Sequence, residues 1–229
     1  MITLQLNTKI VYNIHRKFVL DLFVWQKRWK ANQYHRNRFL HKRRQAGADF
    51  YFVLEALSDA CRTGRNKIFM SGKELLPIFV HCVAQYFPQQ QAGLIKNAAE
   101  IRSLTLSNGA EIYFLHENSP AAGICGDVYV SEWAWVDNPV RLVKLALDLS
   151  INEKWKRTFY SSRMTGDNGE AAYKEFFTLN RVKGESAFFD TVTLFDDVEN
   201  FLDKEKVAEG WTQQAFEELF LCRLPHARW

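Results

Sequence analysis

The sequence predicts an α/β fold in three layers, with a mainly parallel central sheet. Three observations support this prediction. Short apolar strands alternate with amphipathic stretches of helical period along most of the chain. A turn at Gly47 joins one such strand to a helix, and a second apolar strand, residues 128–130, runs into Glu132. Alternation of this kind places parallel strands side by side and covers both faces of the sheet with helices.

The elements follow from apolar periodicity and from turn residues. Ser107-Asn108-Gly109 lies between two strand-like runs and predicts a hairpin, and Gly64 predicts the end of a helix. The expected elements, in chain order, are a helix over 18–32, a strand over 38–42, a helix over 49–61, a strand over 67–71, a helix over 73–87, strands over 101–106, 110–115 and 128–130, a helix over 139–149, a strand over 158–161, and helices over 171–178, 197–204 and 212–222.

Composition restricts the class of protein. A chain of 229 residues with 47% hydrophobic content suits one large globular domain or two small ones. No apolar run reaches the length that a bilayer requires, and the N-terminus lacks a signal-peptide pattern. The four cysteines are widely spaced without a CxxC pair, so we expect reduced thiols in the cytosol rather than a metal site.

Charge is distributed unevenly along the chain. Residues 1–50 contain eleven Lys or Arg and two Asp, a net charge of +9, whereas the whole chain carries only +4. A basic segment favours contact with a polyanion, either nucleotide phosphate or nucleic acid. The alternative is a solvated basic helix face.

Residues 42–49 have the layout of a phosphate-binding loop. A basic strand end, Lys42-Arg43-Arg44, leads through Gln45, Ala46 and Gly47 into a helix that starts near Ala48 and Asp49. Glycine lets backbone N–H groups turn toward a phosphate at the helix N-terminus, where the helix dipole and nearby cations favour negative charge. The usual Lys-Ser/Thr ending is missing, and an ordinary strand–helix connection is the alternative.

Two further segments suggest a nucleotide site. The strand through residues 128–130 ends at Ser131 and Glu132. An acidic residue at a strand end can bind Mg²⁺ or orient an attacking water, and a solvated glutamate is the alternative.

Upstream, Trp25 could stack on a base and the amide of Gln26 could pair with adenine. Core packing of Trp25 and Trp29, spaced four apart on a helix, is the competing interpretation.

Taken together, these motifs resemble the large terminase subunit of tailed bacteriophages, in the group whose loop reads Lys-Ser-Arg-Gln-x-Gly-Ala-Thr. The likeness extends in colinear order over about residues 20–222. The segments that carry it are Trp25-Gln26-x-x-Trp29, Lys42-x-Arg44-Gln45-x-Gly47-Ala48, Glu55-Ala56-Leu57, residues 63–71, 106–111, 126–135 and 154–158, and Glu218-Leu219-Phe220-Leu221-Cys222. The resemblance implies a P-loop NTPase fold of the RecA-like ASCE type. It also implies a motor domain that binds ATP with Mg²⁺ and hydrolyses it to drive DNA translocation.

The resemblance also implies roles for single residues. Gln26, with Trp25, would recognise adenine, and residues Lys42 to Asp49 would surround the phosphates. Arg44 would act on the γ-phosphate and Glu132 on the attacking water; Ser161 and Ser162 lie where the family has its coupling motif. Asp49 and Glu132 are the candidate metal ligands.

Three positions depart from the family pattern. Asp49 replaces the loop threonine whose hydroxyl would ligate Mg²⁺, and Ser131 replaces the Walker B aspartate. The Thr-Pro expected after Ser161 is also missing. We expect these changes to weaken or abolish hydrolysis, unless Asp49 and Asp127 compensate.

Two functional hypotheses follow. In the first, residues 1–229 form one working ATPase domain, with a basic helical segment over about 1–37 and no nuclease domain. In the second, the chain is a catalytically silent terminase mimic that binds a terminase, a portal or DNA without turning ATP over. It could then serve a prophage remnant or a mobile element that interferes with packaging by another phage. A DNA-binding module with a vestigial nucleotide pocket is a third, weaker interpretation. The expected partners are double-stranded DNA and a small terminase subunit or portal protein, with a homo-oligomer as a further option, in the host bacterial cytoplasm.

Overall fold

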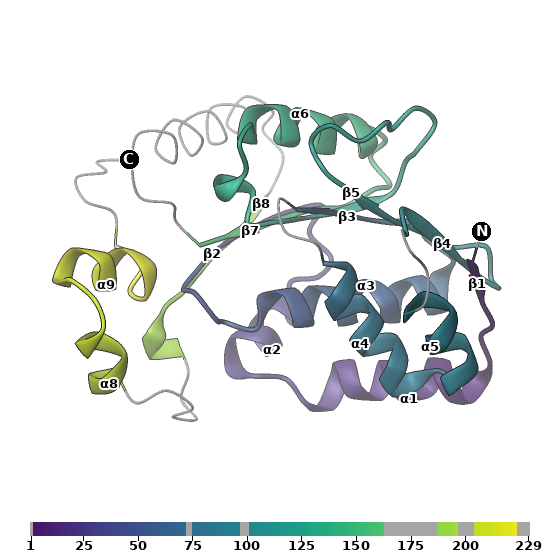
Figure 1. Ribbon diagram of the computed structural model, residues 1–229, viewed down its shortest axis with the longest axis horizontal. Coiled ribbons are helices and arrows are strands. Elements are labelled where there is room, and N and C mark those ends of the chain that lie inside the picture. Colours follow the sequence, from purple (N-terminus) through teal and green to yellow (C-terminus); the bar gives the residue numbers. More distant parts are fainter. Residues whose placement is uncertain (1, 72–74, 97–100, 163–186, 197–203, 224–229) are drawn as a thin grey trace.

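An eight-stranded sheet with helices on both faces forms the body of the molecule in the computed structural model (Figure 1). The structure describes residues 2–71, 75–96, 101–162, 187–196 and 204–223. Strand order across the sheet is β1-β4-β5-β3-β6-β7-β2-β8. All neighbouring strands pair in parallel except β4 and β5, which are antiparallel.

The described elements have the following bounds, with short 3₁₀ helices labelled η. The strands are β1 (Ile2–Leu4), β2 (Asn37–Lys42), β3 (Lys67–Ser71), β4 (Ser103–Leu106), β5 (Glu111–Leu115), β6 (Asp127–Ser131), β7 (Arg157–Ser161) and β8 (Ala187–Val192). The helices are α1 (Thr8–Leu20), α2 (Val24–Ala31), α3 (Ala48–Thr63), α4 (Leu76–Tyr86), α5 (Gln89–Lys96), η1 (Trp133–Trp135), α6 (Pro139–Leu149), η2 (Leu194–Asp196), α8 (Lys204–Glu209) and α9 (Gln213–Leu219).

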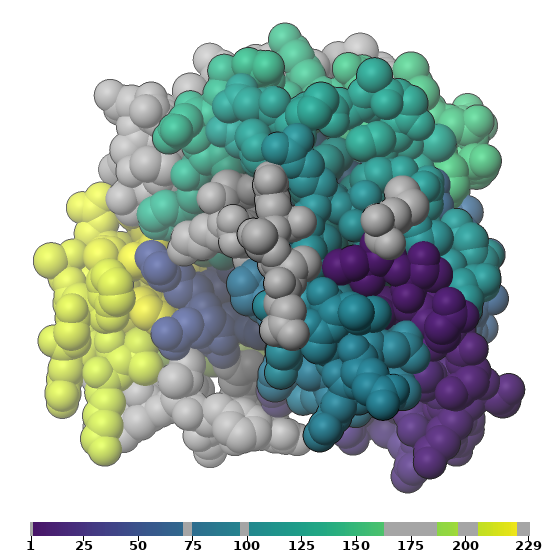
Figure 2. Space-filling view, turned by 45° about the vertical axis from the view of Figure 1, so that its right-hand side comes forward, coloured from purple at the N-terminus to yellow at the C-terminus, as the bar shows by residue number. Residues whose placement is uncertain are grey.

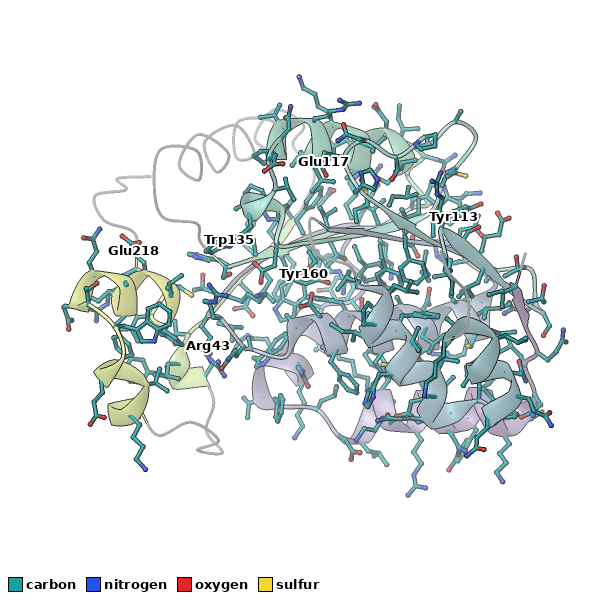
Figure 3. The ribbon with its side chains drawn as sticks, in the orientation of Figure 1. Arg43, Tyr113, Glu117, Trp135, Tyr160 and Glu218 are labelled. Carbon is teal, nitrogen blue, oxygen red and sulfur yellow. The ribbon has the colours of Figure 1, made fainter. Side chains whose placement is uncertain are left out.

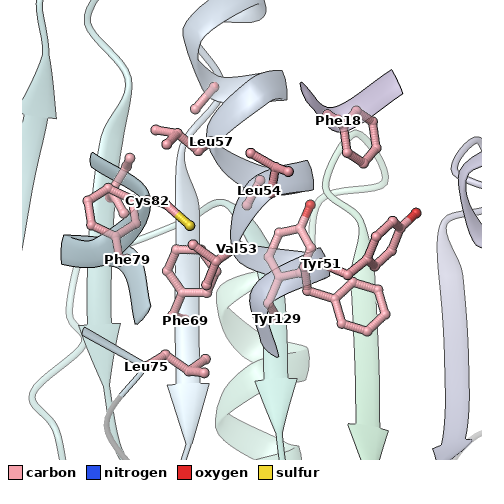
Figure 4. Close-up of a cluster of buried hydrophobic side chains, with 14 of the residues drawn as sticks. Phe18, Tyr51, Val53, Leu54, Leu57, Phe69, Leu75, Phe79, Cys82 and Tyr129 are labelled. Atoms are coloured by element: carbon pink, nitrogen blue, oxygen red, sulfur yellow. The ribbon is translucent and has the colours of Figure 1, made fainter. Parts of the chain in front are cut away.

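The larger hydrophobic core lies between the sheet and helices α1 to α5 (Figure 1). Helix α3 is central to it, because residues on every side of this helix are buried. Figure 4 shows Tyr51, Val53 and Leu54 of α3 packed with Phe69 of β3 and Phe79 of α4. A smaller core on the opposite face packs α6 against the sheet, and a third small cluster joins η2 to α9.

Glycines define both ends of α3. Gly47 precedes the helix with φ +72° and Gly64 follows it with φ +71°, both in the left-handed region that glycine enters at low cost. The N–H of Gly64 donates to the carbonyl of Ala60 at 3.0 Å and closes the last turn. Gly47 thereby sets the start of α3 after the short loop that follows β2, at the end of the sheet where Lys42 lies.

Most of the predicted central elements are confirmed. The strands at 38–42, 67–71, 128–130 and 158–161 and the helices at 49–61 and 139–149 occur within a few residues of their expected bounds. The hairpin around Asn108 is present as β4 and β5. Pro77 lies in the first turn of α4, where its missing N–H costs nothing, so that helix begins at Leu76 rather than at residue 73.

Other expectations were wrong or incomplete. The helix over 18–32 is two helices, because α1 ends at Leu20, with Asp21 as its C-cap, and α2 starts anew at Val24. Strands β1 and β8 and helix α5 were not anticipated. The helix predicted over 171–178 and most of that over 197–204 fall outside the described residues. Asp127 does not reach the strand end near Glu132, since it begins β6 and pairs with Arg65 and Lys67.

Two further observations concern the cysteines and the lengths of the helices. Cys61, Cys82, Cys125 and Cys222 are free thiols, and all but Cys125 are buried. Within the described ranges, no helix is both long enough and apolar enough to cross a membrane.

Candidate nucleotide site

A cavity of about 560 Å³ opens beside the loop between β2 and α3. Its walls are loop residues 44–47, Ala48, Asp49 and Phe50 of α3, Pro77, Ile78 and His81 of α4, and the side chains of Lys42 and Glu132. This volume suits a small organic ligand of nucleotide size. In Figure 2 the loop region (blue) lies between the C-terminal helices (yellow) and the teal helices that include α4. The strands β2 and β6 end at this same edge, as the parallel sheet requires.

The loop has the backbone of an anion site. Gln45 and Gly47 both have positive φ, +57° and +72°. The turn ends at the N-terminus of α3, whose first N–H groups have no acceptor within the helix and whose dipole is positive there. The N–H groups of Arg43 and Arg44 are bonded to Val192 and Leu219 of the C-terminal segments, at 2.8 and 3.0 Å. Residues distant in the chain therefore hold the entrance of the loop in place.

Lys42 and Glu132 form an ion pair at the cavity wall. The Lys42 ammonium donates to Glu132 Oε1, and both side chains are largely buried. Burial raises the pKa of Glu132, but the charge of Lys42 and the hydrogen bonds from Lys42 and Ser162 outweigh that effect. The resulting pKa lies below the ordinary value for glutamate, so Glu132 is a carboxylate at neutral pH. Its backbone is left-handed, with φ +45°, which turns it out of β6.

The end of β7 also contacts Glu132. Its Oε2 accepts hydrogen bonds from the Ser162 N–H at 2.8 Å and from Ser162 Oγ at 2.9 Å. Ser161 Oγ lies 3.3 Å from the same oxygen. The two serines expected to act in coupling are therefore in direct contact with the glutamate expected to act on water.

Asp49 and Ser131 also meet at the site. Ser131 Oγ donates to Asp49 Oδ1 at 2.6 Å, although the two residues are 82 positions apart. Asp49 lines the cavity, whereas Ser131 is 1% exposed and does not line it. The buried Tyr160 is close by, since the charge of Asp49 adds to burial in raising the pKa of that phenol.

Arg44 is held by an aromatic side chain that sequence reasoning did not single out. Its guanidinium carbon lies 5.4 Å from the ring centroid of Trp135, within cation–π range. Trp135 Nε1 donates to the Ser162 carbonyl at 2.8 Å. Trp135 follows Glu132 by three residues, but nothing in that spacing indicates contact with the loop.

Two of the predicted site residues have other roles. Trp25 is 0% exposed and packs edge-on against Tyr51 with ring centroids 5.4 Å apart, so it cannot stack on a base. This corrects the prediction for Trp25 and favours core packing. Arg43 does not line the cavity: it is 4% exposed, and burial lowers its pKa against the opposing effect of Cys222 and Asp196. Figure 3 shows Arg43 and Trp135 at the same end of the sheet, close to the C-terminal helices.

Gln26 lies beside the loop without lining the cavity. Its Oε1 accepts the Phe23 N–H at 3.0 Å, and its Nε2 would lie 3.9 Å from a Cβ added to Gly47. Phe23 lies equally close to Gly47, at 3.8 Å by the same measure, and is 40% exposed. The exposed ring next to the loop is therefore that of Phe23, not Trp25.

Comparison with known proteins agrees with this geometry. Residues 40–220 match the protein family described as terminase large subunit, T4likevirus-type, N-terminal. The chain belongs to this terminase family. It is 30% identical over 236 aligned positions to a protein of Haemophilus phage HP1 named probable terminase, ATPase subunit, an alignment that covers 90% of this chain. The terminase chain spans only 38% of the length of that relative.

Solved terminase structures share the fold. The large terminase of bacteriophage HK97 matches with a TM-score of 0.65 and 11% identity, over 94% of this chain and 54% of that one. The large terminase of a thermophilic bacteriophage, solved in complex with ADP, matches with a TM-score of 0.55 and 14% identity, over 91% of this chain and 52% of that one. The terminase chain therefore has the P-loop NTPase fold of large terminase ATPase domains, with a mostly parallel sheet.

Proposed function

We propose that this terminase chain binds ATP in the cavity beside Gly47 and hydrolyses it as the motor domain of a phage DNA-packaging machine. The observation that carries the proposal is the meeting of Lys42 and Glu132, from two parallel strands, at the open edge of one cavity. The family match and the ADP held by the thermophilic phage terminase support it. We further propose that residues 1–229 act as a single ATPase domain.

Each wall of the cavity has a role in this proposal. Residues 42 and 44–49 surround the phosphates, with the ammonium of Lys42 and the N-terminus of α3 balancing their charge. Arg44 contacts the γ-phosphate, an interaction that contributes about 10³–10⁵ in rate in related NTPases. Gln26 and Phe23, which lie next to Gly47, are the residues proposed to contact the base.

The Lys42–Glu132 pair is the contact that a bound triphosphate would change in this proposal. Triphosphate oxygens compete with Glu132 for the Lys42 ammonium, because both are anionic acceptors. Once Lys42 turns to phosphate, the hydrogen bonds from Ser162 still fix the Glu132 carboxylate and favour its ionised form. A carboxylate in this state can orient and polarise a water for attack.

The same contacts give Ser161 and Ser162 a means of coupling. Ser162 directly follows β7, and its backbone N–H donates to the Glu132 carboxylate. Any movement of this carboxylate therefore strains or breaks that hydrogen bond. We infer that the state of the nucleotide is transmitted to the chain beyond β7 through this bond.

The donor set is compatible with Mg²⁺. The described residues contain no group of three or more His, Cys, Asp or Glu able to hold a metal ion, so any such ion would also need phosphate oxygens. Asp49 lines the cavity as a carboxylate oxygen donor, the kind that Mg²⁺ prefers. Bound Mg²⁺ would neutralise charge that develops on the β- and γ-phosphate oxygens.

The wider setting is proposed from the family. A packaging motor acts on double-stranded DNA, and its partners are a small terminase subunit or portal protein and further copies of the chain, in the host bacterial cytoplasm. The alternative is a catalytically silent terminase mimic, which would keep the fold and a partner surface without turning ATP over.

ATP hydrolysis by purified chain separates these functions. We expect Mg²⁺-dependent turnover that Glu132→Gln reduces by at least about 10²-fold, as loss of a general base does, while ATP affinity stays within about threefold. The substitution keeps the shape of the side chain and its capacity to accept from Ser162. Glu117→Gln is a control outside the cavity. ATP binding without turnover in the unaltered chain would support the silent mimic instead, and full turnover in Glu132→Gln would remove Glu132 from the mechanism.

A further inference from the structure

The two residues that depart from the usual metal site are hydrogen-bonded to each other. P-loop NTPases hold Mg²⁺ with a hydroxyl from the loop and an aspartate from the Walker B strand. In this chain the loop side supplies the carboxylate of Asp49, and the strand supplies the hydroxyl of Ser131. Their 2.6 Å bond joins the same two elements, α3 and β6, with the chemical groups exchanged.

We propose that this is a reciprocal exchange that preserves the metal site, with Asp49 as the metal ligand and Ser131 as its positioning residue. The proposal rests on the nucleotide site proposed above. It replaces the expectation that Asp49 and Ser131 are two independent losses.

Burial supports this division of roles. Asp49 lines the cavity, whereas Ser131 is 1% exposed and does not. Oδ1 of Asp49 accepts the hydrogen bond from Ser131, and this bond fixes the orientation of the Asp49 side chain. A neutral hydroxyl does not cancel the charge of the carboxylate. The buried serine can thus orient the carboxylate but cannot itself reach a ligand in the cavity.

Electrostatics explains why the carboxylate is tolerated on the loop side. Asp49 lies in the first turn of α3, where the positive end of the helix dipole favours an anion. The cations Lys42 and Arg44 line the same cavity. A single carboxylate at this contact is stable, whereas two facing each other at the same separation would repel or share a proton.

The exchange predicts a distinctive pattern in a double-mutant cycle. Asp49→Thr leaves two hydroxyls and no carboxylate, so the factor by which Mg²⁺ tightens ATP binding should fall at least tenfold. Ser131→Asp places two carboxylates in contact and should lower the Tm of the metal-free protein. Combining both substitutions restores one hydroxyl and one carboxylate. The double variant should return to within about threefold of the unaltered chain in metal dependence, and its Tm should recover.

Asp49→Asn separates a metal role from a structural one. The amide keeps an oxygen that accepts from Ser131 but loses the charge, so Tm should stay near that of the unaltered chain while the Mg²⁺ effect is lost. This variant also keeps the proposal testable if Ser131→Asp does not fold.

ATP affinity is measured for each variant in excess Mg²⁺ and in EDTA, alongside Tm without nucleotide. Unchanged Mg²⁺ dependence of ATP affinity in Asp49→Thr or Asp49→Asn would overturn the exchange. So would a double variant whose losses in Mg²⁺ dependence and in Tm equal the summed losses of the two single variants. Absence of ATP binding by the unaltered chain in both buffers would overturn the proposed function as well, so the two failures are distinguishable.

Discussion

Trp135 joins three parts of the candidate site that come from separate elements. Its ring faces the guanidinium of Arg44, and its Nε1 holds the carbonyl of Ser162. Ser162 in turn donates to Glu132. Arg44 and the glutamate proposed to polarise water are thus linked through one indole, which makes Trp135 a positioning residue in the proposed mechanism.

Substitutions at Trp135 should separate its two contacts. Trp135→Phe keeps a ring face for Arg44 and loses the bond to Ser162, whereas Trp135→Leu loses both. A cation–π contact contributes about 0.5–1 kcal/mol at exposed sites, so we expect Trp135→Leu to lower kcat by a further factor of about 2–5 relative to Trp135→Phe. Steady-state hydrolysis measures kcat, and ADP affinity is the companion readout.

Because ADP lacks the γ-phosphate that Arg44 is proposed to contact, its affinity should stay the same in both variants. A similar loss of ADP and ATP affinity would mean that Trp135 only stabilises the fold.

The position of the loop between a strand and a helix was predictable, because its signal is local. Gly47 and the basic residues before it identify the loop by their order along the chain. The Asp49–Ser131 contact could not be predicted, because its partners are 82 residues apart and meet only through sheet order. Trp25 was misplaced because an aromatic residue at helical spacing fits a base site and a core equally well.

At the scale of elements, the loop is supported by the C-terminal part of the described chain. Leu194 N–H donates to the Phe220 carbonyl at 2.8 Å, tying η2 to α9, and the backbone N–H of Arg44 donates to Leu219. Strand β8 pairs with β2 immediately before the loop. The loop between β2 and α3 therefore depends on contacts that are remote in sequence, as well as on its own glycine.

The turn between β2 and α3 should depend on glycine at residue 47. We expect Gly47→Ala to lower the free energy of unfolding by about 1–2 kcal/mol, because φ +72° is costly for a residue with a Cβ. Crowding is not the reason, since a Cβ there would lie 3.8 Å from Phe23 at the closest. Gly47→Asn should cost less, since asparagine tolerates this conformation. Urea unfolding measures both.

Gly93 provides a control at which the same substitution should change the free energy of unfolding in the opposite direction. It lies in α5, with nothing within 4 Å of an added Cβ. Gly93→Ala should therefore raise the free energy of unfolding by about 0.5–1 kcal/mol. Destabilisation by both alanines, or by neither, would contradict the backbone argument.

Elements with strong periodicity and clear caps were predictable, and those at the margins were not. Helix α3 has glycine at both ends and β6 is wholly buried, so their patterns are unambiguous. Strand β1 is three residues long, and β8 alternates only partly between buried and exposed positions. Both are edge strands whose pairing is decided by the rest of the sheet.

At the scale of the whole molecule, part of the basic charge near the N-terminus is used in internal ion pairs. Arg38 is 0% exposed and pairs with Glu55, Arg28 pairs with Asp190 and Asp196, and Lys42 pairs with Glu132. The basic segment thus neutralises acidic residues from the remainder of the chain. This reduces the support for a surface built mainly for DNA binding, which the charge count alone had suggested.

Buried ion pairs should make the fold sensitive to acid. Burial raises the pKa of Asp127, but hydrogen bonds and charge from Arg65 and Lys67 outweigh it, and the net shift is downward, as for Glu132. The unfolded state then binds more protons than the folded state as pH falls below about 4. The stability that these pairs contribute is complete above the unfolded pKa values and is lost as pH falls through the lower folded ones.

Asp127→Asn tests this linkage at the end of the sheet away from the cavity. At pH 7 we expect a loss of about 1.5–3 kcal/mol in the free energy of unfolding, because Lys67, which is 0% exposed, loses the more buried of its two carboxylate partners and keeps only Asp59. Between about pH 5 and 3 its stability should fall less steeply than that of the unaltered chain, since one of the titrating groups is gone. Urea unfolding at each pH measures both effects, with the exposed Glu153→Gln as the matched control. An equally steep acid dependence in Asp127→Asn would show that other carboxylates govern the acid response, and an unchanged stability at pH 7 would show that Lys67 does not need this partner.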